Sequence, residues 1–149
     1  PDNNNLQMIN YTNTNIKGYQ DKVITVHEDF VPVLDRMNSF AHSLGIIVWV
    51  TSSLRHSTLV PGAIVPPAKM SNHLVGHAID ANLQIGSVWY NSKMLASPTG
   101  IVLDFILQCE AAHIRWGGRF STPDPVHFDS AVNVLHPDRW KEIYESLNK

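Results

Sequence analysis

The chain has 149 residues, of which 44% are hydrophobic and 16% charged, and its formal net charge is −2. This composition is typical of one soluble globular domain and excludes an intrinsically disordered chain. The small charge gives no electrostatic reason to expect nucleic acid or an anionic membrane as the main partner. No apolar run approaches the roughly 20 residues that span a bilayer.

The single cysteine, Cys109, excludes an intramolecular disulfide and leaves the redox compartment open. No charged-then-apolar signal peptide is visible from Pro1 onward. The missing initiator methionine is compatible with a mature or excised form. Eight histidines are the first hint of a metal site.

Residues 1–27 are polar and rich in asparagine, and Gly18 interrupts them. They predict an irregular lead-in segment, attached to the core by its few apolar residues (Leu6, Met8, Ile9 and Tyr11). No repeat or linker follows, so residues 28–149 are expected to form a single domain.

From Glu28 to about Ser43, apolar residues recur every three or four positions, which predicts an amphipathic helix. Gly45 provides its C-cap, and Pro32 is tolerated in the first turn. Residues 46–54 (IIVWVTSSL) predict a buried strand because β-branched and aromatic residues dominate. Residues 55–70, rich in proline, predict a surface loop.

A strand is predicted at residues 76–84, followed by a loop through Trp89 and Tyr90. Ser97-Pro98 predicts the start of a helix. Short strands are expected at residues 114–116 and 126–128. A last helix begins near Pro137 and buries Trp140, Ile143, Tyr144 and Leu147. This order predicts an α+β fold, a small antiparallel sheet flanked by helices with the site on its open face.

The stretch Ser71–Asp80 (SNHLVGHAID) places an imidazole and a carboxylate where a loop enters a strand. His73 and His77 are four residues apart, but Gly76 interrupts them and no glutamate follows His73, so this is not a helical zincin motif. On the predicted strand, His77 and Asp80 point to opposite faces. Asp80 is the better anionic ligand for a dication, and His77 is then a packing or supporting residue.

His127 is the third candidate ligand, and Asp124 lies three residues before it on a rigid turn. Two imidazoles and one carboxylate leave the fourth zinc position open, as in catalytic sites. Asp124 could then act as a general base towards water, and pass the proton to the leaving amine. It could equally be a turn former between two prolines.

Arg55 follows the strand at residues 46–54, where it could bind a substrate carboxylate or stabilise an oxyanion. A surface salt bridge is the alternative. His56 could touch a substrate. The remaining histidines (His27, His42, His113 and His136) have no context that suggests ligation, and are expected to be structural.

Together these residues resemble the zinc D-alanyl-D-alanine carboxypeptidases and L-alanyl-D-glutamate endopeptidases of the hedgehog/lysostaphin-type fold. The family motif of Ser, His, Gly, Ala and Asp is matched at every fixed position by residues 71, 73, 76, 78 and 80. The upstream motif corresponds to Thr51-Ser52-Ser53-Leu54-Arg55, with serine at position 53 where glycine is usual. The downstream motif corresponds to Trp116-Gly117-Gly118 and Asp124-Pro125-Val126-His127-Phe128.

The resemblance implies one Zn²⁺ per chain, held by His73, Asp80 and His127, with Asp124 as the general base. Arg55 and Ser71 would contact substrate. Trp-Gly-Gly with Asp124 is more similar to the endopeptidase branch, although Arg119 and Asp129 depart from its usual residues.

The implied function is a peptidoglycan hydrolase of the endolysin kind that cleaves a stem-peptide bond, with the L-Ala–D-Glu bond as the first choice. A D-alanyl-D-alanine carboxypeptidase or dipeptidase, and a non-catalytic hedgehog-like zinc-binding module, are the alternatives. We expect a monomer that acts on the cell wall, whether periplasmic, secreted or delivered by a phage.

Overall fold

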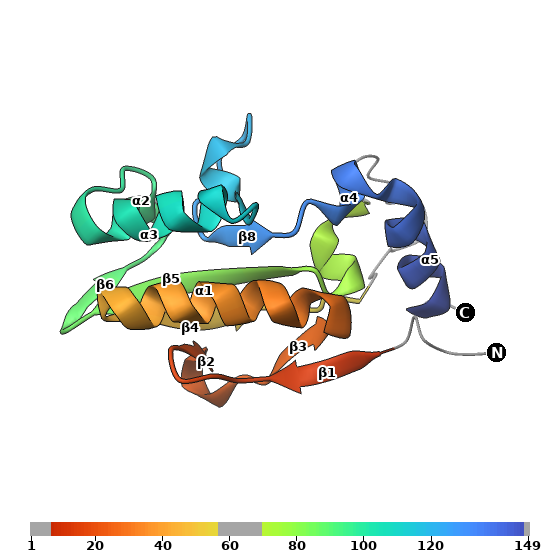
Figure 1. Cartoon of the computed structure of the whole chain (residues 1–149), viewed down its shortest axis with the longest axis horizontal. Helices are drawn as coiled ribbons and strands as arrows, with labels where there is room; N and C mark the ends of the chain where they lie inside the picture. Colours follow the sequence, from red (N-terminus) through yellow and green to blue (C-terminus); the bar gives the residue numbers. More distant parts are fainter. Residues whose placement is uncertain (1–6, 57–69, 148–149) are drawn as a thin grey trace.

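A six-stranded sheet forms the centre of the protein in the computed structural model, which describes residues 7–56 and 70–147 (Figure 1). Its strands run in the order β2-β4-β5-β8-β7, and β6 also pairs with β5. Their bounds are β2 Ile16–Gly18, β4 Ile46–Ser52, β5 Ala78–Ile85, β6 Val88–Tyr90, β7 Arg115–Trp116 and β8 His127–Asp129. All pairs are antiparallel except β2 with β4, which is parallel. The predicted α+β class is confirmed, with one parallel edge strand added.

The helices divide between one face of the sheet and one end of the molecule (Figure 1). The long helices α1 (Val31–Leu44) and α3 (Gly100–Ala111) contact each other, and α1 packs on β4 while α3 packs beside β7. The short helix α2 (Ser92–Leu95) contacts β6. Helices α4 (Val132–Leu135) and α5 (Pro137–Leu147) lie together at the end remote from β6. No helix of the described residues is long and apolar enough to cross a membrane.

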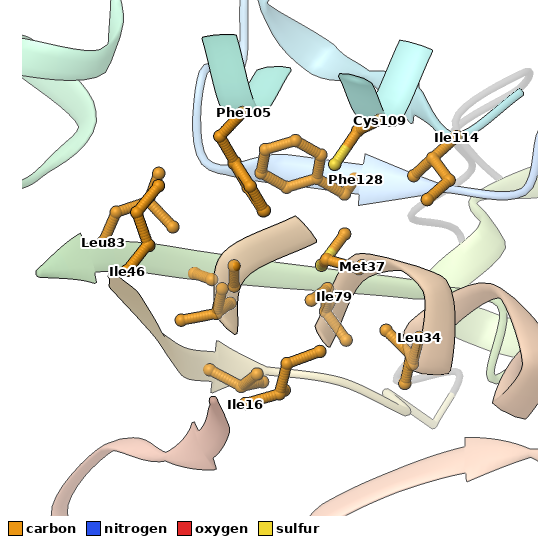
Figure 2. Packing of buried hydrophobic residues seen from close by; sticks show 14 of the residues in the cluster. Ile16, Leu34, Met37, Ile46, Ile79, Leu83, Phe105, Cys109, Ile114 and Phe128 are labelled. Carbon is orange, nitrogen blue, oxygen red and sulfur yellow. The ribbon is translucent and has the colours of Figure 1, made fainter. Parts of the chain in front are cut away.

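The main core fills the space between α1, α3 and the inner face of the sheet. Figure 2 shows Phe105 and Cys109 of α3 reaching towards Phe128 of β8, with Met37 of α1 on the other side. The rings of Phe105 and Phe128 meet edge to face, with centroids 6.1 Å apart, as aromatic pairs prefer. All four side chains have no solvent exposure. This core leaves the opposite face of the sheet free for polar side chains.

The predicted α1 helix agrees with the structure. A 3₁₀ turn over Glu28–Phe30 precedes it, Pro32 lies in its first turn, and Gly45 ends it in the left-handed conformation at φ 71°. Glycine adopts this conformation without a Cβ clash. The predicted strands at 46–54, 76–84, 114–116 and 126–128 are also present, with ends shifted by up to two residues.

The irregular lead-in is a wrong prediction for most of the described part of residues 1–27. Strands β1 (Met8–Tyr11) and β3 (Ile24–His27) form a two-stranded antiparallel sheet, and β2 joins the central sheet. Ile16, Ile24 and Val26 are buried in the main core. The many asparagines obscured these short β-branched stretches, whose pairing partners lie in other parts of the chain.

Two other predictions need correction. The loop expected through Trp89 and Tyr90 is strand β6, because Gly86 (φ 59°) allows a tight hairpin after β5. Helix α3 begins at Gly100, after Thr99 rather than Ser97, and the preceding helix α2 is capped by the Asn91 side chain. Of the loop predicted at 55–70, residues 57–69 lie outside the described residues.

Candidate metal centre and active site

His73 lies on a 3₁₀ turn over Asn72–Val75 that leads into β5. The Ser71 hydroxyl accepts the backbone N–H of His73 and caps this turn, and Gly76 ends it at φ 71°. A Cβ at Gly76 would meet the backbone nitrogen of His27 at 2.5 Å, so glycine is required for this close approach. The sequence motif therefore sets the position of the His73 backbone.

The imidazole of His73 has a fixed orientation. Its Nδ1 lies 2.8 Å from the carbonyl oxygen of Ser53, at the end of β4. Because a carbonyl can only accept, Nδ1 carries a proton, and Nε2 is the ring nitrogen left to face Asp80 or a metal ion. Nε2 faces Asp80 Oδ1 at 3.1 Å.

Asp80 and His127 are direct cross-strand neighbours on β5 and β8. Both side chains project from the sheet face opposite the helices, because Ile79 and Phe128, next to them in sequence, enter the core. His127 Nδ1 lies 3.2 Å from the same Asp80 Oδ1 that His73 approaches. The three side chains offer ligand atoms that all lie within 4.8 Å of one another. The structure thus brings together His73, Asp80 and His127, as the sequence predicts.

Asp129 and Arg115 support His127, and sequence reasoning missed this role. The second ring nitrogen of His127, Nε2, donates to Asp129 Oδ2 at 2.6 Å. Arg115 binds both oxygens of Asp129, each at 2.9 Å, from the adjacent strand β7. This pairing directs Nδ1 of His127 towards Asp80. A carboxylate behind a ligating histidine is a common device for orienting the ring and raising its basicity.

A polar network continues from Arg115 to the turn that carries His73. The Arg115 guanidinium also donates to Asn133 Oδ1 at 3.0 Å. Asn133 exchanges side-chain and backbone hydrogen bonds with Asn72, which precedes His73. The two halves of the candidate ligand set are therefore fixed relative to each other by hydrogen bonds.

The charges of this cluster are strongly coupled. Burial raises the pKa of Asp80, but hydrogen bonds from His127 and His73 outweigh it and hold that pKa well below its ordinary value. Burial lowers the pKa of His127, but the interactions with Asp129 and Asp80 outweigh burial and raise this pKa to about 9. For Asp129, the hydrogen bonds from His127 and Arg115 overcome burial and lower the pKa to about 2. Both carboxylates are thus ionised at neutral pH, and they favour a positive charge between them.

This donor set fits zinc. Two imidazole nitrogens and one carboxylate oxygen converge from one side, and the free nitrogen of each imidazole has a hydrogen-bond acceptor. Catalytic zinc sites commonly have three protein ligands and one open position. The open side is a cavity of about 400 Å³, whose lining includes Arg55, Ser71 and Asp124.

The segment that carries Asp124 is held against His127 by Trp116, Gly117 and Gly118. The indole of buried Trp116 donates to the carbonyl oxygen of Pro125 at 2.7 Å. A Cβ at Gly117 would come within 2.8 Å of the His127 Cβ and closer still to the Asp124 carbonyl oxygen. A Cβ at Gly118 would collide with the Trp116 ring. The two glycines therefore allow this turn to pack closely beside His127.

Arg55 also lines this cavity. Its backbone N–H donates to the carbonyl oxygen of His73 at 3.0 Å, which ties its position to the turn that carries His73. Its exposed guanidinium approaches the Ser71 hydroxyl at 3.5 Å. Ser71 thus serves the local structure of the turn as well as facing the cavity. His56, the next residue, is exposed and is not among the cavity-lining residues.

Arg119 points away from the cavity, although it follows the glycine pair. It binds both oxygens of Glu110 at 3.0 Å and lies over the Trp116 ring. The departure from the family pattern at position 119 is therefore a surface ion pair on the outer side of the turn.

His77 belongs to a second group, with His27 and Asp29. Its Nδ1 lies 2.8 Å from the Ser130 hydroxyl, and its ring packs on those of His27 and Phe30. His27 Nδ1 accepts the backbone N–H of Asp29, so its lone pair is already used. The Asp29 carboxylate pairs with Arg139 of α5. These contacts make the second group a structural junction rather than a second metal centre.

Residues 66–130 match the family model described as D-alanyl-D-alanine carboxypeptidase. The matched segment contains His73, Asp80, Asp124 and His127, and the resemblance to this peptidase family is confirmed. No curated protein matches the chain significantly. Among solved structures, the chain is similar to the L-Ala D-Glu endopeptidase ChiX of Serratia marcescens. The two share 21% identity over 70% of this chain and 79% of that chain, with a TM-score of 0.45.

Proposed function

We propose that the protein is a zinc-dependent peptidase that hydrolyses a bond in the peptidoglycan stem peptide, as a monomer with one Zn²⁺ per chain. The observation that carries this proposal is the convergence of His73 Nε2 and His127 Nδ1 on Asp80 Oδ1, beneath a cavity lined by Asp124 and Arg55. The family match over residues 66–130 supports a peptidase.

The chain's own residues divide the work of peptide hydrolysis. His73, Asp80 and His127 would hold zinc, which supplies Lewis acidity for water activation and carbonyl polarisation. Asp124 accepts a proton from the attacking water and returns it to the leaving amine. Arg55 neutralises negative charge on the substrate or on the developing oxyanion. Asp129 and Arg115 keep the His127 ring in its ligating orientation.

The L-Ala–D-Glu bond is the preferred target. The combination of Trp116-Gly117-Gly118 with Asp124 is more similar to the endopeptidase branch than to the carboxypeptidases, which tend to have Glu at the position of Asp124. D-Glu also carries a free α-carboxylate when it is linked through its side chain, and the exposed Arg55 guanidinium suits such a group.

A D-alanyl-D-alanine carboxypeptidase is the second candidate, since the matching family model carries that description and Arg55 equally suits a terminal carboxylate. Mass spectrometry of digested muropeptides separates the two. Release of the D-Glu-containing peptide supports the endopeptidase, and release of free D-Ala supports the carboxypeptidase. No product from any wall substrate would favour a non-catalytic zinc module.

Replacing Asp124 with Ala tests the mechanism. We expect zinc content by elemental analysis to stay at one ion per chain, while kcat for muropeptide hydrolysis falls by at least about 100-fold, as expected for loss of a general base. Asp104→Ala, at an exposed position of α3, is the matched control and should retain activity. Full activity of the Asp124→Ala enzyme would refute the assigned role.

A further inference from the structure

The open face of the sheet extends beyond the metal-ligand cluster. Along β5, Ile79, Ala81 and Leu83 are buried, whereas the alternate residues Asp80, Asn82 and Gln84 are partly exposed. Asp80 belongs to the candidate active site, so the face that carries it continues along β5 towards β6. Its other amide side chains, at positions 82 and 84, serve no role in the proposed hydrolysis.

Three aromatic side chains gather at the far part of this face. Trp49 of β4 is paired with Asn82, and Trp89 of β6 with Gln84. The two indoles stack with centroids 5.9 Å apart, and Tyr19 meets Trp89 edge to face at 5.8 Å. We call these three residues the aromatic cluster. Trp89 is 40% exposed despite its size, so part of its surface is available to a ligand.

Hydrogen bonding fixes the aromatic cluster in one arrangement. The Trp49 indole N–H donates to Gln84 Oε1 at 2.8 Å, and Gln84 Nε2 in turn donates to the carbonyl oxygen of Gly86. A preformed aromatic surface with amide groups beside it requires little ordering when a ligand binds.

A second cavity lies at the end of β4, beside the active-site cavity. It has a volume of about 290 Å³, shares Arg55 with the active-site cavity and extends to Thr51 and Lys22. Lys22 donates to the carbonyl oxygen of Thr51 at 3.0 Å and directly follows the turn Tyr19–Asp21. The second cavity therefore reaches from Arg55 to Lys22, the residue after the turn that carries Tyr19.

We propose that the aromatic cluster binds the N-acetylated sugar to which the stem peptide is attached, an inference that rests on the proposed function. The C–H face of a pyranose ring packs on flat aromatic side chains, and its hydroxyl and acetamide groups pair with amides such as Asn82 and Gln84. Aromatic surface that retains a few placed polar groups is the usual composition of small-ligand sites.

The spacing agrees with the L-Ala–D-Glu bond as target. In the substrate, the L-Ala residue and one lactyl unit separate the carbonyl carbon of the cleaved bond from the sugar. When extended, these two units span roughly 7 Å. Asn82, the partner of Trp49, lies two residues from Asp80, about 7 Å along β5, and Gln84, the partner of Trp89, lies about 14 Å away. A sugar attached at this distance would begin over Trp49 and extend towards Trp89.

The test compares two substrates with the same stem peptide, one carrying the N-acetylglucosamine–N-acetylmuramic acid disaccharide and one without sugar. For the wild-type enzyme, we expect kcat/KM to be higher for the disaccharide substrate. The ratio should fall about fivefold or more in Trp89→Ala, mainly through KM, because apolar contact area with the sugar is lost. Trp89→Phe should recover part of the ratio. Val88→Ala, an exposed apolar residue on the same strand, should leave the ratio unchanged.

A direct binding measurement separates this proposal from the proposed function. Titration of the free disaccharide should shift the Trp49 and Trp89 indole N–H signals in the NMR spectrum of the wild-type protein, even if no peptide bond is cleaved. Unmoved indole signals would overturn the sugar site, as would a Trp89→Ala enzyme with an unchanged substrate ratio. A cluster that only anchors the β5–β6 hairpin predicts a lower Tm in Trp89→Ala with no change in that ratio.

Discussion

His127 uses its two ring nitrogens for different tasks, one towards Asp80 and the other towards Asp129. Asp129 was visible in the sequence only as an unusual residue after Phe128. However, residues 127 and 129 must share a face of any strand that contains both, and this periodicity could have identified the pair. Arg115 could not have been identified in this way, because its contact with Asp129 depends on the register between β7 and β8.

Asp129→Asn preserves the shape of this side chain but removes its charge. We expect zinc affinity to fall about 10- to 100-fold, as is typical for the loss of a supporting carboxylate. Competition with a chromophoric chelator measures this change. Asp104→Asn, on the exposed surface of α3, is the control, and equal affinity of both variants would contradict the positioning role.

His77 gives a prediction for the pH dependence of stability. Burial, with the nearby His27, lowers its pKa to about 4 in the folded protein, whereas an unfolded histidine has a pKa of about 6.5. Between pH 4 and 6.5 only the unfolded state takes up the proton. The contribution of neutral His77 to the free energy of unfolding is therefore complete above pH 6.5 and is lost as the pH falls to 4.

Protonation of His77 in the unfolded state lowers the free energy of unfolding by about 3 kcal/mol at most over this pH range. In His77→Gln, the free energy of unfolding from urea titrations should therefore depend less on pH between 4 and 6.5 than in the wild type. His136→Gln, on the surface, provides the comparison. An unchanged slope in His77→Gln would show that another group accounts for the acid sensitivity.

At the scale of elements, the sequence predicted the helices and strands whose formation depends on residues close together in the chain. The α1 helix follows from its apolar period and Gly45, and β4 from its β-branched run. The strands β1, β2 and β3 did not follow, because stretches of three or four residues carry little local signal and form only with their partners. The β5–β6 hairpin was missed although Gly86-Ser87 permits its tight turn.

The shape of the turn from Trp116 to Pro125 depends on two glycines, Gly117 and Gly118, because a Cβ at either position would collide with neighbouring atoms. Gly117→Ala should push the Asp124 backbone away from His127, and we expect kcat to fall at least about tenfold, because small displacements of catalytic groups are costly. Gly86→Ala is the matched control. Its positive φ of 59° makes an alanine there strained, a strain that Gly117→Ala does not introduce, but its Cβ meets nothing within 4 Å. A Gly117→Ala enzyme with normal kcat would contradict this explanation of the motif.

At the scale of the whole molecule, the candidate ligands come from a 3₁₀ turn and two strands, and Asp80 and His127 are 47 positions apart in the sequence. The sequence could predict which residues meet because the three motifs together resemble a known family. Spacing alone left His77 and Asp124 undecided. The polar network of Asn72, Asn133, Arg115 and Asp129 joins four segments and had no sequence signal of its own.

A bound zinc ion would connect these segments and stabilise the fold. At a zinc concentration about 100 times the Kd, linkage contributes about 2.7 kcal/mol, which corresponds to roughly 5–10 °C in Tm. EDTA should therefore lower the Tm by this amount, measured by thermal unfolding, and added zinc should restore it. His73→Ala should show no such response. A Tm unaffected by EDTA and zinc would contradict the metal centre.

Helix α5 closes over the turn that carries His73. The Trp140 indole donates to the carbonyl oxygen of Ser71 at 3.1 Å, and Arg139 pairs with Asp29 at 3.0 Å, ahead of α1. A chain that leaves the ribosome N-terminus first can make these contacts only after residue 140 has emerged. The turn that carries His73 therefore acquires this support only after α5 has been synthesised, and a nascent chain ending before α5 would lack it although every proposed zinc ligand is already present.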